Sequence, residues 1–337
     1  MKHNDVVILI PSYEPDEQLI NVVHKLLELE FPILIVNDGS KEEYNVIFDK
    51  VNKDVEYISY PTNHGKGYAL KVGYKNILTL FPDAKYIITA DGDGQHSIKD
   101  IEKMYEILKS ADELVLGVRL FDKSVPFRSR FGNEWTKVNR CLLTKQYLED
   151  DQCGLRGFPI RYLTELIKIK GNRYEYEINQ LTAFQLRDYK IIRMPIEVIY
   201  IDNNSKSHFN NFPDTVRIHS KIIIQGIPAL LCLGLLIAGL ILLYHFGYSY
   251  YHLMVLPAYL VTTLIYVGVL DIIQKSQKPL NRLLRELIFT ITKMTFVFAC
   301  MYLFVDAFRM SFYVAIPLLV IVSCFYNLLL PRVVKLN

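Results

Sequence analysis

Residues 86–96 read YIITADGDGQH, an apolar run that ends in two aspartates separated by a glycine. Tyr86–Thr89 has the length and composition of a short buried strand. Carboxylates spaced like Asp91 and Asp93 can converge on a hard cation such as Mg²⁺ or Mn²⁺, and the amide oxygen of Gln95 can add a ligand. A polar turn with capping aspartates is the alternative. The position directly after a strand favours the metal site.

The same strand pattern recurs along the first half of the chain. Helical patterns over Glu17–Glu30 and Gly67–Leu80 lie between the runs. Strands that alternate with helices predict an α/β domain with a doubly wound, mainly parallel sheet. Ligands of such sheets bind at the carboxyl ends of the strands, so the residues after each run are expected to meet in one site. The further predicted strands are Val6–Ile10, Ile33–Val36, Val55–Tyr60 and Glu113–Gly117.

Two segments after these runs each allow two interpretations. Asn63–Gly67 is rich in glycine and contains Lys66, but it lacks the P-loop spacing. It is either a cradle for a diphosphate at the start of a helix or a helix-initiating turn with an exposed lysine. Asp38 follows the second strand, where a carboxylate either accepts hydrogen bonds from a base or ribose or caps a turn.

A basic cluster follows the fifth run and includes Arg119, Arg128 and Arg130. Arginine binds phosphate oxygens through two parallel hydrogen bonds, so these residues are candidates for an anion site. A solvated helix face is the alternative, which we favour for Lys137 and Arg140. The polar segment 150–156 carries more charge than an ordinary turn, and it marks a second candidate region.

Composition separates the chain into two parts. Of 38 Lys and Arg and 35 Asp and Glu, residues 221–337 hold only 9 and 3. The remainder is an ordinary, slightly acidic composition, so the formal net charge of +3 does not indicate nucleic acid binding. The five cysteines are odd in number and form no CxxC, which argues against a disulfide framework or a zinc site.

The apolar part predicts an all-α transmembrane domain over residues 222–337. Its four candidate helices are each about 20 residues long, the length that crosses a bilayer. The loop 274–286 carries four basic residues whereas the loop 244–252 carries no Lys or Arg, which places the former loop and the amino-terminal domain in the cytosol. We predict a multi-pass integral protein of the cell inner membrane. The predicted spans are 222–243, 253–273, 287–305 and 312–330.

Residues 203–221 separate the two parts and combine basic with aromatic side chains. This composition beside a membrane span favours an interfacial connector that contacts anionic headgroups, whereas the alternative is an ordinary linker. The predicted organisation is therefore a catalytic domain over 1–202, the connector over 203–221 and the membrane domain over 222–337. The membrane helices are compatible with homo-oligomers, although they contain no strong GxxxG pattern.

Taken together, the motifs of the first part resemble family-2 glycosyltransferases with a GT-A fold, in particular the polyprenyl-phosphate glycosyltransferases. That group includes dolichol-phosphate mannose synthases and bactoprenol glucosyltransferases. The membrane part resembles the family's GtrA-like four-helix extension in helix count and in its end SCFYNLLLPR. The motifs that carry the main resemblance occur in the family's order: IPSYEP (10–15), VNDGS (36–40), NHGKGYA (63–69), ADGDGQH (90–96), GVR (117–119), DDQCGLR (150–156), RYEYEINQ (173–180) and IYIDNNSKSHFN (199–210).

The resemblance implies a role for each candidate residue. Asp38 would contact the nucleoside of the sugar donor, and Pro11, Tyr13 and Glu14 would line the same pocket. Lys66 and Asp91 would also bind the donor. Asp91, Asp93 and Gln95 would hold a divalent metal, Mg²⁺ or Mn²⁺, against the donor diphosphate. Arg119, with Arg128 or Arg130, would bind the phosphate of the lipid acceptor, and Asp150, Gln152 and Arg156 would shape the sugar and acceptor pocket. The implied catalytic residues are Asp91, Asp93, Arg119 and Arg130.

The implied reaction is inverting transfer of one sugar from a nucleotide diphosphate sugar, with UDP favoured, to a polyprenyl phosphate such as undecaprenyl or dolichyl phosphate. Two alternatives remain: a glycan or diacylglycerol hydroxyl as acceptor, with Asp150, Asp151 or Glu177 as base, and a non-catalytic membrane scaffold. Asn37 replaces the first Asp of the family's VDDGS, and Glu14-Pro15 replaces Asn-Glu, which leaves the preferred nucleotide open. No QxxRW follows Gln180, which argues against processive synthesis.

Overall fold

The computed structural model describes residues 3–119, 148, 150, 152–187, 189–197 and short stretches between 291 and 322. The chain divides into two compact units, and the first unit contains the whole described sheet. The predicted spans 222–243 and 253–273 lie outside the described residues, and 287–305 and 312–330 are described only in fragments. Within the described parts, no helix combines the length and apolar character that a bilayer crossing needs. The four-helix membrane domain stays a prediction.

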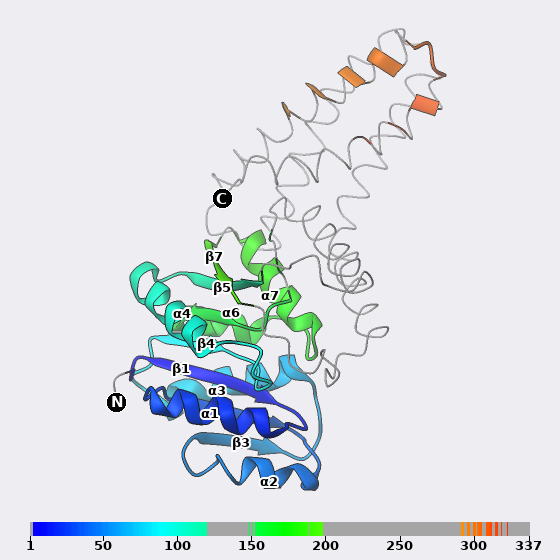
Figure 1. The fold of residues 1–337 in the computed structure, drawn as a ribbon. Coiled ribbons are helices and arrows are strands. Elements are labelled where there is room, and N and C mark those ends of the chain that lie inside the picture. The colour runs from blue at the N-terminus through cyan, green and yellow to red at the C-terminus, as the bar shows by residue number, and fades with distance from the viewer. Residues whose placement is uncertain are drawn as a thin grey trace. The chain divides into compact units, whose positions relative to one another are not determined.

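The first unit is built around a seven-stranded sheet of order β3-β2-β1-β4-β6-β5-β7 (Figure 1). All neighbouring pairs are parallel except those made by β6, which runs antiparallel to both β4 and β5. The prediction of a mainly parallel α/β sheet is therefore confirmed. The strands are β1 (Val6–Ser12), β2 (Ile33–Asp38), β3 (Glu56–Tyr60), β4 (Tyr86–Thr89), β5 (Leu114–Arg119), β6 (Arg156–Pro159) and β7 (Ile191–Ile196).

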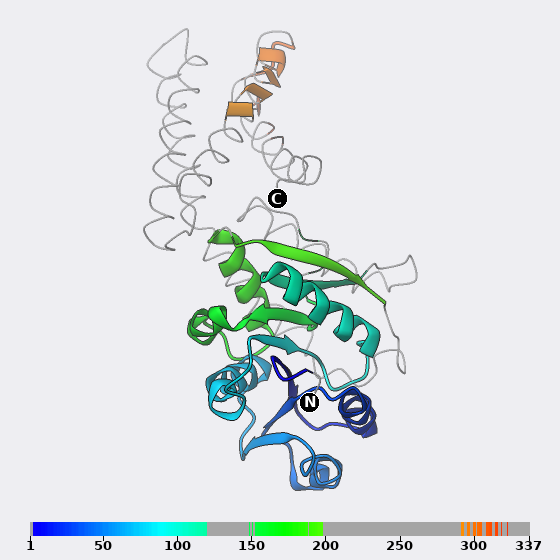
Figure 2. The same cartoon turned by 90° about the vertical axis from the view of Figure 1, so that its left-hand side faces the viewer.

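Helices cover both faces of the sheet (Figure 2). Helices α1, α2 and α4 pack on one face, and α3, α6 and α7 pack on the other. The helix bounds are α1 (Glu17–Glu28), α2 (Asn45–Phe48), α3 (Lys66–Leu80), α4 (Ile98–Ala111), α6 (Leu163–Lys168) and α7 (Glu175–Leu186), with short 3₁₀ turns at Glu42–Tyr44 and Ile160–Tyr162.

Strand β1 shows why its sequence requires cover on both sides. Ile8 and Ile10 belong to one core cluster, whereas Val7 and Leu9 belong to the other. Because successive side chains of a strand point to opposite faces, a continuous run of apolar residues is stable only between two layers of helices. All five residues from Val6 to Ile10 are fully buried.

Polar side chains fix where two of the helices begin. The Asp16 carboxylate accepts a hydrogen bond of 2.9 Å from the backbone N–H of Gln18, at the start of α1. At the start of α4, the Ser97 hydroxyl accepts one of 3.1 Å from the N–H of Asp100. These caps satisfy N–H groups that have no partner within the helix. The second cap begins α4 directly after the DGDGQH segment and so holds that loop in place.

Strand β6 was not predicted, and it changes what lies at the site. Its residues Arg156–Pro159 contain no β-branched side chain and begin with a charge, so the segment resembles a polar turn. In the structure Arg156 pairs with Thr89 on β4 and with Leu116 on β5. The segment that leads into β6 therefore lies beside the residues that follow β4 and β5.

Candidate functional site

Asp91 lies at the centre of a group of charged side chains at the carboxyl ends of the strands. It follows β4, and its Oδ1 lies 2.7 Å from the Lys66 Nζ at the start of α3. The same ammonium group lies 3.0 Å from the Oε1 of Glu177 on α7. On the other side of the carboxylate, the His96 Nε2 lies 3.5 Å from Asp91 Oδ2. Three separate segments thus surround the first aspartate of the motif.

The two aspartates of the motif have opposite pKa shifts. Burial raises the pKa of Asp91, but the nearby Lys66 ammonium and His96 outweigh burial and hold that pKa well below its usual range. The pKa of Asp93 is raised, first by burial and then by the negative charge of Asp91. The Asp93 carboxylate is therefore ionised at a cost, which a bound cation would remove.

The predicted metal ligands fit a site that is completed by substrate. Gln95 donates its backbone N–H to Asp93 Oδ1 over 3.0 Å, which folds the DGDGQ loop into a compact turn. No cluster of three or more His, Cys, Asp or Glu suited to a metal occurs within the part of the chain that the structure describes. Mg²⁺ typically binds one or two carboxylates and takes its other ligands from water and substrate phosphates, a requirement that Asp91, Asp93 and Gln95 meet.

The Asp38 carboxylate supports the loop that precedes α3. Its Oδ1 accepts hydrogen bonds from the Tyr60 hydroxyl (2.7 Å) and the His64 N–H (2.9 Å), and its Oδ2 accepts one from the Gly65 N–H (2.7 Å). Asp38 is 2% exposed. It occupies the amides at the start of α3 that a diphosphate cradle would use, which favours the helix-initiating turn for Asn63–Gly67. The expectation of an exposed lysine in that turn is wrong, because the Lys66 side chain is 17% exposed and pairs with two carboxylates. The nucleoside contact of Asp38 stays a prediction.

The remaining predicted donor residues line the turn after β1. Glu14 donates its backbone N–H to the Ser40 hydroxyl over 2.8 Å, and its carboxylate lies 3.2 Å from Lys41 Nζ. The backbone at Glu14 has a φ of 47°, a left-handed conformation in which asparagine is more common than glutamate. Pro11 is within β1, and the pKa of Tyr13 is raised by burial and by its hydrogen bond with Glu14. These residues lie together beside Asp38.

Arg119 and Asp150 form a buried bidentate pair at the end of β5. Arg119 donates from Nε to Asp150 Oδ2 (2.7 Å) and from Nη2 to Asp150 Oδ1 (3.1 Å). Although burial raises the pKa of Asp150, the Arg119 guanidinium outweighs this effect and lowers it. The Asp150 side chain is 2% exposed, whereas that of Arg119 is 24% exposed. The arginine thus remains accessible in a fixed orientation.

The segment after Asp150 is fastened to the interior by Arg156. Gln152 donates its backbone N–H to Asp150 Oδ1 over 3.0 Å. Arg156 is 1% exposed and donates to the carbonyls of Cys153 (2.9 Å) and Glu177 (2.6 Å). It thus shapes this region by joining two segments. Burial raises the pKa of the Cys153 thiol to about 12, so this cysteine stays a packing residue.

Five residues that the sequence singles out lie outside the described part of the chain. They are the candidate site residues Arg128, Arg130 and Asp151 and the basic residues Lys137 and Arg140. The structure thus brings Asp91, Asp93, Gln95 and Lys66 into one group. It places Arg119 and Asp150 in a neighbouring pair, and the contact that each would make with a ligand stays a prediction.

His96 and Glu177 both contact the site, although no motif predicts a role for His96 and Glu177 is expected only as a base. His96 is 8% exposed, and its Nδ1 has no hydrogen-bond partner among the described residues. Its place at the end of DGDGQH was a signal for its proximity to Asp91. Glu177 lies 86 positions after Asp91 in the chain, and no local pattern predicts that Lys66 links the two.

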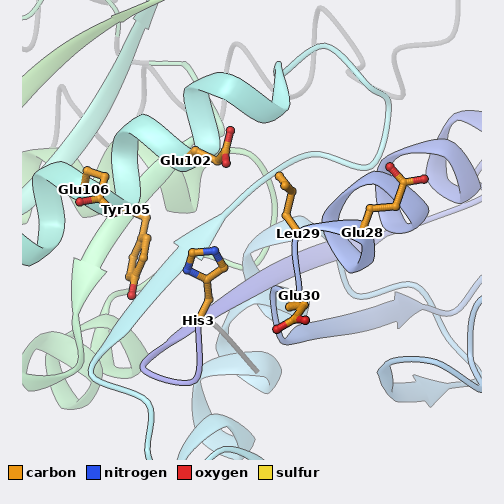
Figure 3. A pocket seen from close by; sticks show the side chains of 7 residues that line it. All are labelled: His3, Glu28, Leu29, Glu30, Glu102, Tyr105 and Glu106. Atoms are coloured by element: carbon orange, nitrogen blue, oxygen red, sulfur yellow. The ribbon is translucent and has the colours of Figure 1, made fainter.

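A separate hollow lies at the opposite end of the sheet (Figure 3). His3 there stacks on Phe31 with ring centroids 4.2 Å apart and meets Tyr105 edge-on at 5.1 Å. This hollow lies near the amino ends of β1 and β2, whereas the candidate site lies at the carboxyl ends. Its lining residues are His3, Glu28, Leu29, Glu30, Glu102, Tyr105 and Glu106.

Comparison with known proteins identifies the domain. The sequence model of the family described as glycosyl transferase family 2 matches residues 7–161. An uncharacterized protein of Methanocaldococcus jannaschii is 30% identical over 232 residues, which cover 66% of this chain and 93% of that protein. The chain belongs to glycosyl transferase family 2. This membership, with the mainly parallel sheet, confirms the predicted GT-A-like α/β domain of a family 2 glycosyltransferase.

Two further similarities are found for this chain. A protein of Methanococcus voltae named UDP-N-acetylglucosamine–dolichyl-phosphate N-acetylglucosaminyltransferase is 29% identical, over 58% of this chain and 86% of its own length. A structure of glucosyl-3-phosphoglycerate synthase from Mycobacterium tuberculosis with Mn²⁺, UDP and phosphoglyceric acid has a TM-score of 0.48 at 15% identity and covers 66% of this chain and 78% of that one.

Proposed function

We propose that this family 2 glycosyltransferase transfers one sugar from a nucleotide diphosphate sugar, with UDP favoured, to a polyprenyl phosphate. The observation that carries the proposal is that an acidic loop, Asp91 to Asp93, and the partly exposed guanidinium of Arg119, fixed by Asp150, lie at the same carboxyl end of the sheet. The loop suits a cation and a diphosphate, and the guanidinium suits a second phosphate. The similarity to a dolichyl-phosphate N-acetylglucosaminyltransferase supports this acceptor class.

A divalent cation, Mg²⁺ or Mn²⁺, would be held by Asp91, Asp93 and the amide oxygen of Gln95. When bound, it supplies positive charge to the diphosphate as that group departs. The pKa of Asp93 is raised by burial and by the charge of Asp91, so a cation bound beside Asp93 would compensate this negative charge. Lys66, which lies between Asp91 and Glu177, keeps a second positive charge in the same place.

The reaction requires the protein to bring two anions together. An oxygen of the acceptor phosphate attacks the anomeric carbon of the sugar, and the bond from that carbon to the diphosphate breaks on the opposite face. The configuration inverts, and the nucleoside diphosphate leaves with the bonding electron pair. Since the acceptor phosphate is already ionised at neutral pH, no side chain has to remove a proton. Arg119 would hold the acceptor phosphate, and Asp150 fixes the direction of its guanidinium.

The surroundings of the candidate bases favour this acceptor over a hydroxyl group. A hydroxyl acceptor needs a general base, and the described candidates are Asp150 and Glu177. Asp150 pairs with Arg119 and has a lowered pKa, and Glu177 pairs with Lys66. Both carboxylates are thus already engaged by a cationic side chain.

We further propose that residues 222–337 anchor the enzyme in the cell inner membrane with its catalytic domain in the cytosol. The support is the apolar composition of this part and the basic loop 274–286. The lipid acceptor would then be glycosylated on the cytosolic leaflet, where its phosphate lies at headgroup depth.

The test offers a panel of nucleotide sugars to the full-length protein with polyprenyl phosphate and diacylglycerol side by side. Mass spectrometry of the lipid fraction identifies the product. We expect a polyprenyl-phosphate sugar, and a product on diacylglycerol alone would contradict the proposal. Arg119→Ala should raise the KM for the lipid phosphate more than the KM for the donor. The opposite order would remove Arg119 from the acceptor site.

A further inference from the structure

Glu177 takes part in a closed ring of contacts around Asp91. Its Oε1 lies 3.0 Å from Lys66 Nζ, which in turn lies 2.7 Å from Asp91 Oδ1. Glu177 is 6% exposed and Lys66 is 17% exposed at the side chain, so the link is largely protected from solvent. The ammonium group is shared between two carboxylates that come from β4 and from α7.

The backbone of Glu177 closes the ring from the other side. Its carbonyl accepts a hydrogen bond of 2.6 Å from Arg156 Nη1, and Arg156 Nε donates to the Cys153 carbonyl over 2.9 Å. The next residue, Gly154, lies directly against Asp91, because a Cβ added there would come within 2.4 Å of Asp91 Oδ2. One residue of α7 thus controls both neighbours of the Asp91 carboxylate.

We propose that Glu177 is a positioning residue that holds the Asp91 carboxylate for the divalent cation and the donor diphosphate. Its side chain restrains Lys66 on one side of Asp91, and its carbonyl restrains the segment 153–156 on the other. The same ring joins the acidic loop to the segment that follows Asp150, so the predicted donor and acceptor sides share one support. This inference rests on the proposed function for the identity of the ligands.

The charges predict effects of opposite sign for the two ends of the link. In Glu177→Gln, the Lys66 ammonium loses one of its two carboxylate partners in the link and keeps Asp91. This change strengthens the competing pair and removes a negative charge near the cation, and both effects lower cation affinity. Lys66→Met removes the competing ammonium and leaves Asp91, Asp93 and Glu177 without it, so cation affinity should rise. If Glu177 and Lys66 only stabilised the fold, their substitution would not be expected to change cation affinity in opposite directions.

The first experiment measures Mn²⁺ binding to the full-length protein by electron paramagnetic resonance, without donor or acceptor. Glu177→Gln should weaken binding about tenfold, as is typical when a partner of a metal ligand is lost. Glu175→Gln is the matched control. Glu175 lies on the same helix, is 7% exposed and accepts a hydrogen bond from the Asn172 N–H instead of from Lys66. Equal Mn²⁺ affinity in the wild type and Glu177→Gln, or an equal loss in Glu175→Gln, overturns the proposal.

The second experiment separates the link from a general loss of folding. If Glu177→Gln does not fold, the double variant Lys66→Met with Glu177→Gln removes both charges, which a buried pair tolerates better than the loss of one. We expect Lys66→Met to bind Mn²⁺ more tightly than the wild type, and the double variant to bind it less tightly than Lys66→Met because it also lacks the negative charge of Glu177. A Lys66→Met variant that binds Mn²⁺ more weakly than the wild type overturns the link.

These outcomes are distinguishable from failure of the proposed function. Mn²⁺ binding does not depend on which lipid accepts the sugar, so a hydroxyl acceptor would leave the result intact. A wild-type protein that binds no Mn²⁺ overturns both the metal site and the role of Glu177. Normal wild-type binding with no effect of Glu177→Gln overturns the role of Glu177 alone.

Discussion

Acidic side chains cluster at both the carboxyl end and the amino end of the sheet, but their surroundings differ. At the carboxyl end, Asp38, Asp91 and Asp150 each meet donors from a segment distant in the sequence. At the amino end, four of the seven residues that line the hollow are glutamates, and they surround an aromatic stack of His3, Phe31 and Tyr105. The partners differ in kind, because Glu106 at the amino end pairs over 3.5 Å with Lys109 on its own helix, whereas the three carboxylates at the carboxyl end are held by other segments.

The largest expected effect tests whether activity belongs to the carboxyl end. Asp93→Ala should lower formation of lipid-linked sugar by about 100-fold or more, the size of loss typical when one stabilising group leaves a transition state. The melting temperature should not fall, because burial and the charge of Asp91 already raise the pKa of Asp93 and make its ionised form unfavourable. Product formation from labelled donor measures the first effect. Near-normal turnover by this variant would remove Asp93 from the metal site.

The second prediction concerns the energy of one compensated carboxylate. Asp150→Asn should lower the free energy of unfolding by about 2 kcal/mol at pH 7, because it removes the charge of the carboxylate that binds the partly buried Arg119 guanidinium through two hydrogen bonds. The pKa of Asp150 is lowered in the folded state. Its contribution to the free energy of unfolding is therefore present above the usual Asp pKa of about 4, and it is lost as the pH falls through the pKa of Asp150 in the folded protein.

Urea unfolding of the wild type and of Asp150→Asn, measured between pH 7 and pH 3, checks this second prediction. The difference between the two proteins should shrink below about pH 4. A difference that stays constant with pH would show that the pair contributes through packing instead of charge.

The fold and the site differ in how far the sequence predicts them. Five strands and the helices α1 and α3 follow from local runs and periodicity, and the motif at 91–95 follows from its position after β4. Strand β6 was missed because Arg156–Pro159 lacks strand-forming residues, and its pairing depends on neighbours distant in the sequence.

Helix α7 shows a further limit of periodicity. Polar and apolar residues of this helix are buried alike, as Gln180 and Leu181 illustrate, with exposures of 1% and 0%. Amphipathic spacing therefore gives no signal, and the link from Glu177 to Asp91 through Lys66 appears only in three dimensions. The structure was needed wherever a partner is chosen by tertiary packing and not by local sequence.

The third prediction alters the space around Asp91 without replacing a charged residue. Gly154→Ala places a Cβ within 2.4 Å of Asp91 Oδ2 and should lower Mn²⁺ affinity and turnover by about tenfold. Gly157→Ala is the control, since its Cβ would come within 2.7 Å of Leu108 Cδ1 in the core. Both variants should lose about 1–3 kcal/mol of stability from overpacking. Similar Mn²⁺ affinity in the two variants would contradict the steric role of Gly154.

The smallest effect is expected at the amino end. Glu102 lines the hollow between α1 and α4. Glu102→Gln should change the free energy of unfolding by no more than about 0.5 kcal/mol, the usual range for a surface substitution. Turnover should stay unchanged, as measured in the assay used for Asp93→Ala. A clear fall in turnover would show that acidic character at either end of the sheet affects catalysis, and the comparison between the two ends would no longer hold.

The Arg119–Asp150 pair also joins two residues that lie 31 positions apart in the chain. The backbone N–H of Arg119 lies 3.2 Å from Asp150 Oδ2, so the two ends of the intervening segment are clasped together at the rim of the sheet. The contact therefore ties the end of β5 to the segment that leads into β6, so one ion pair fixes the spacing of these two strand ends beside the acidic loop.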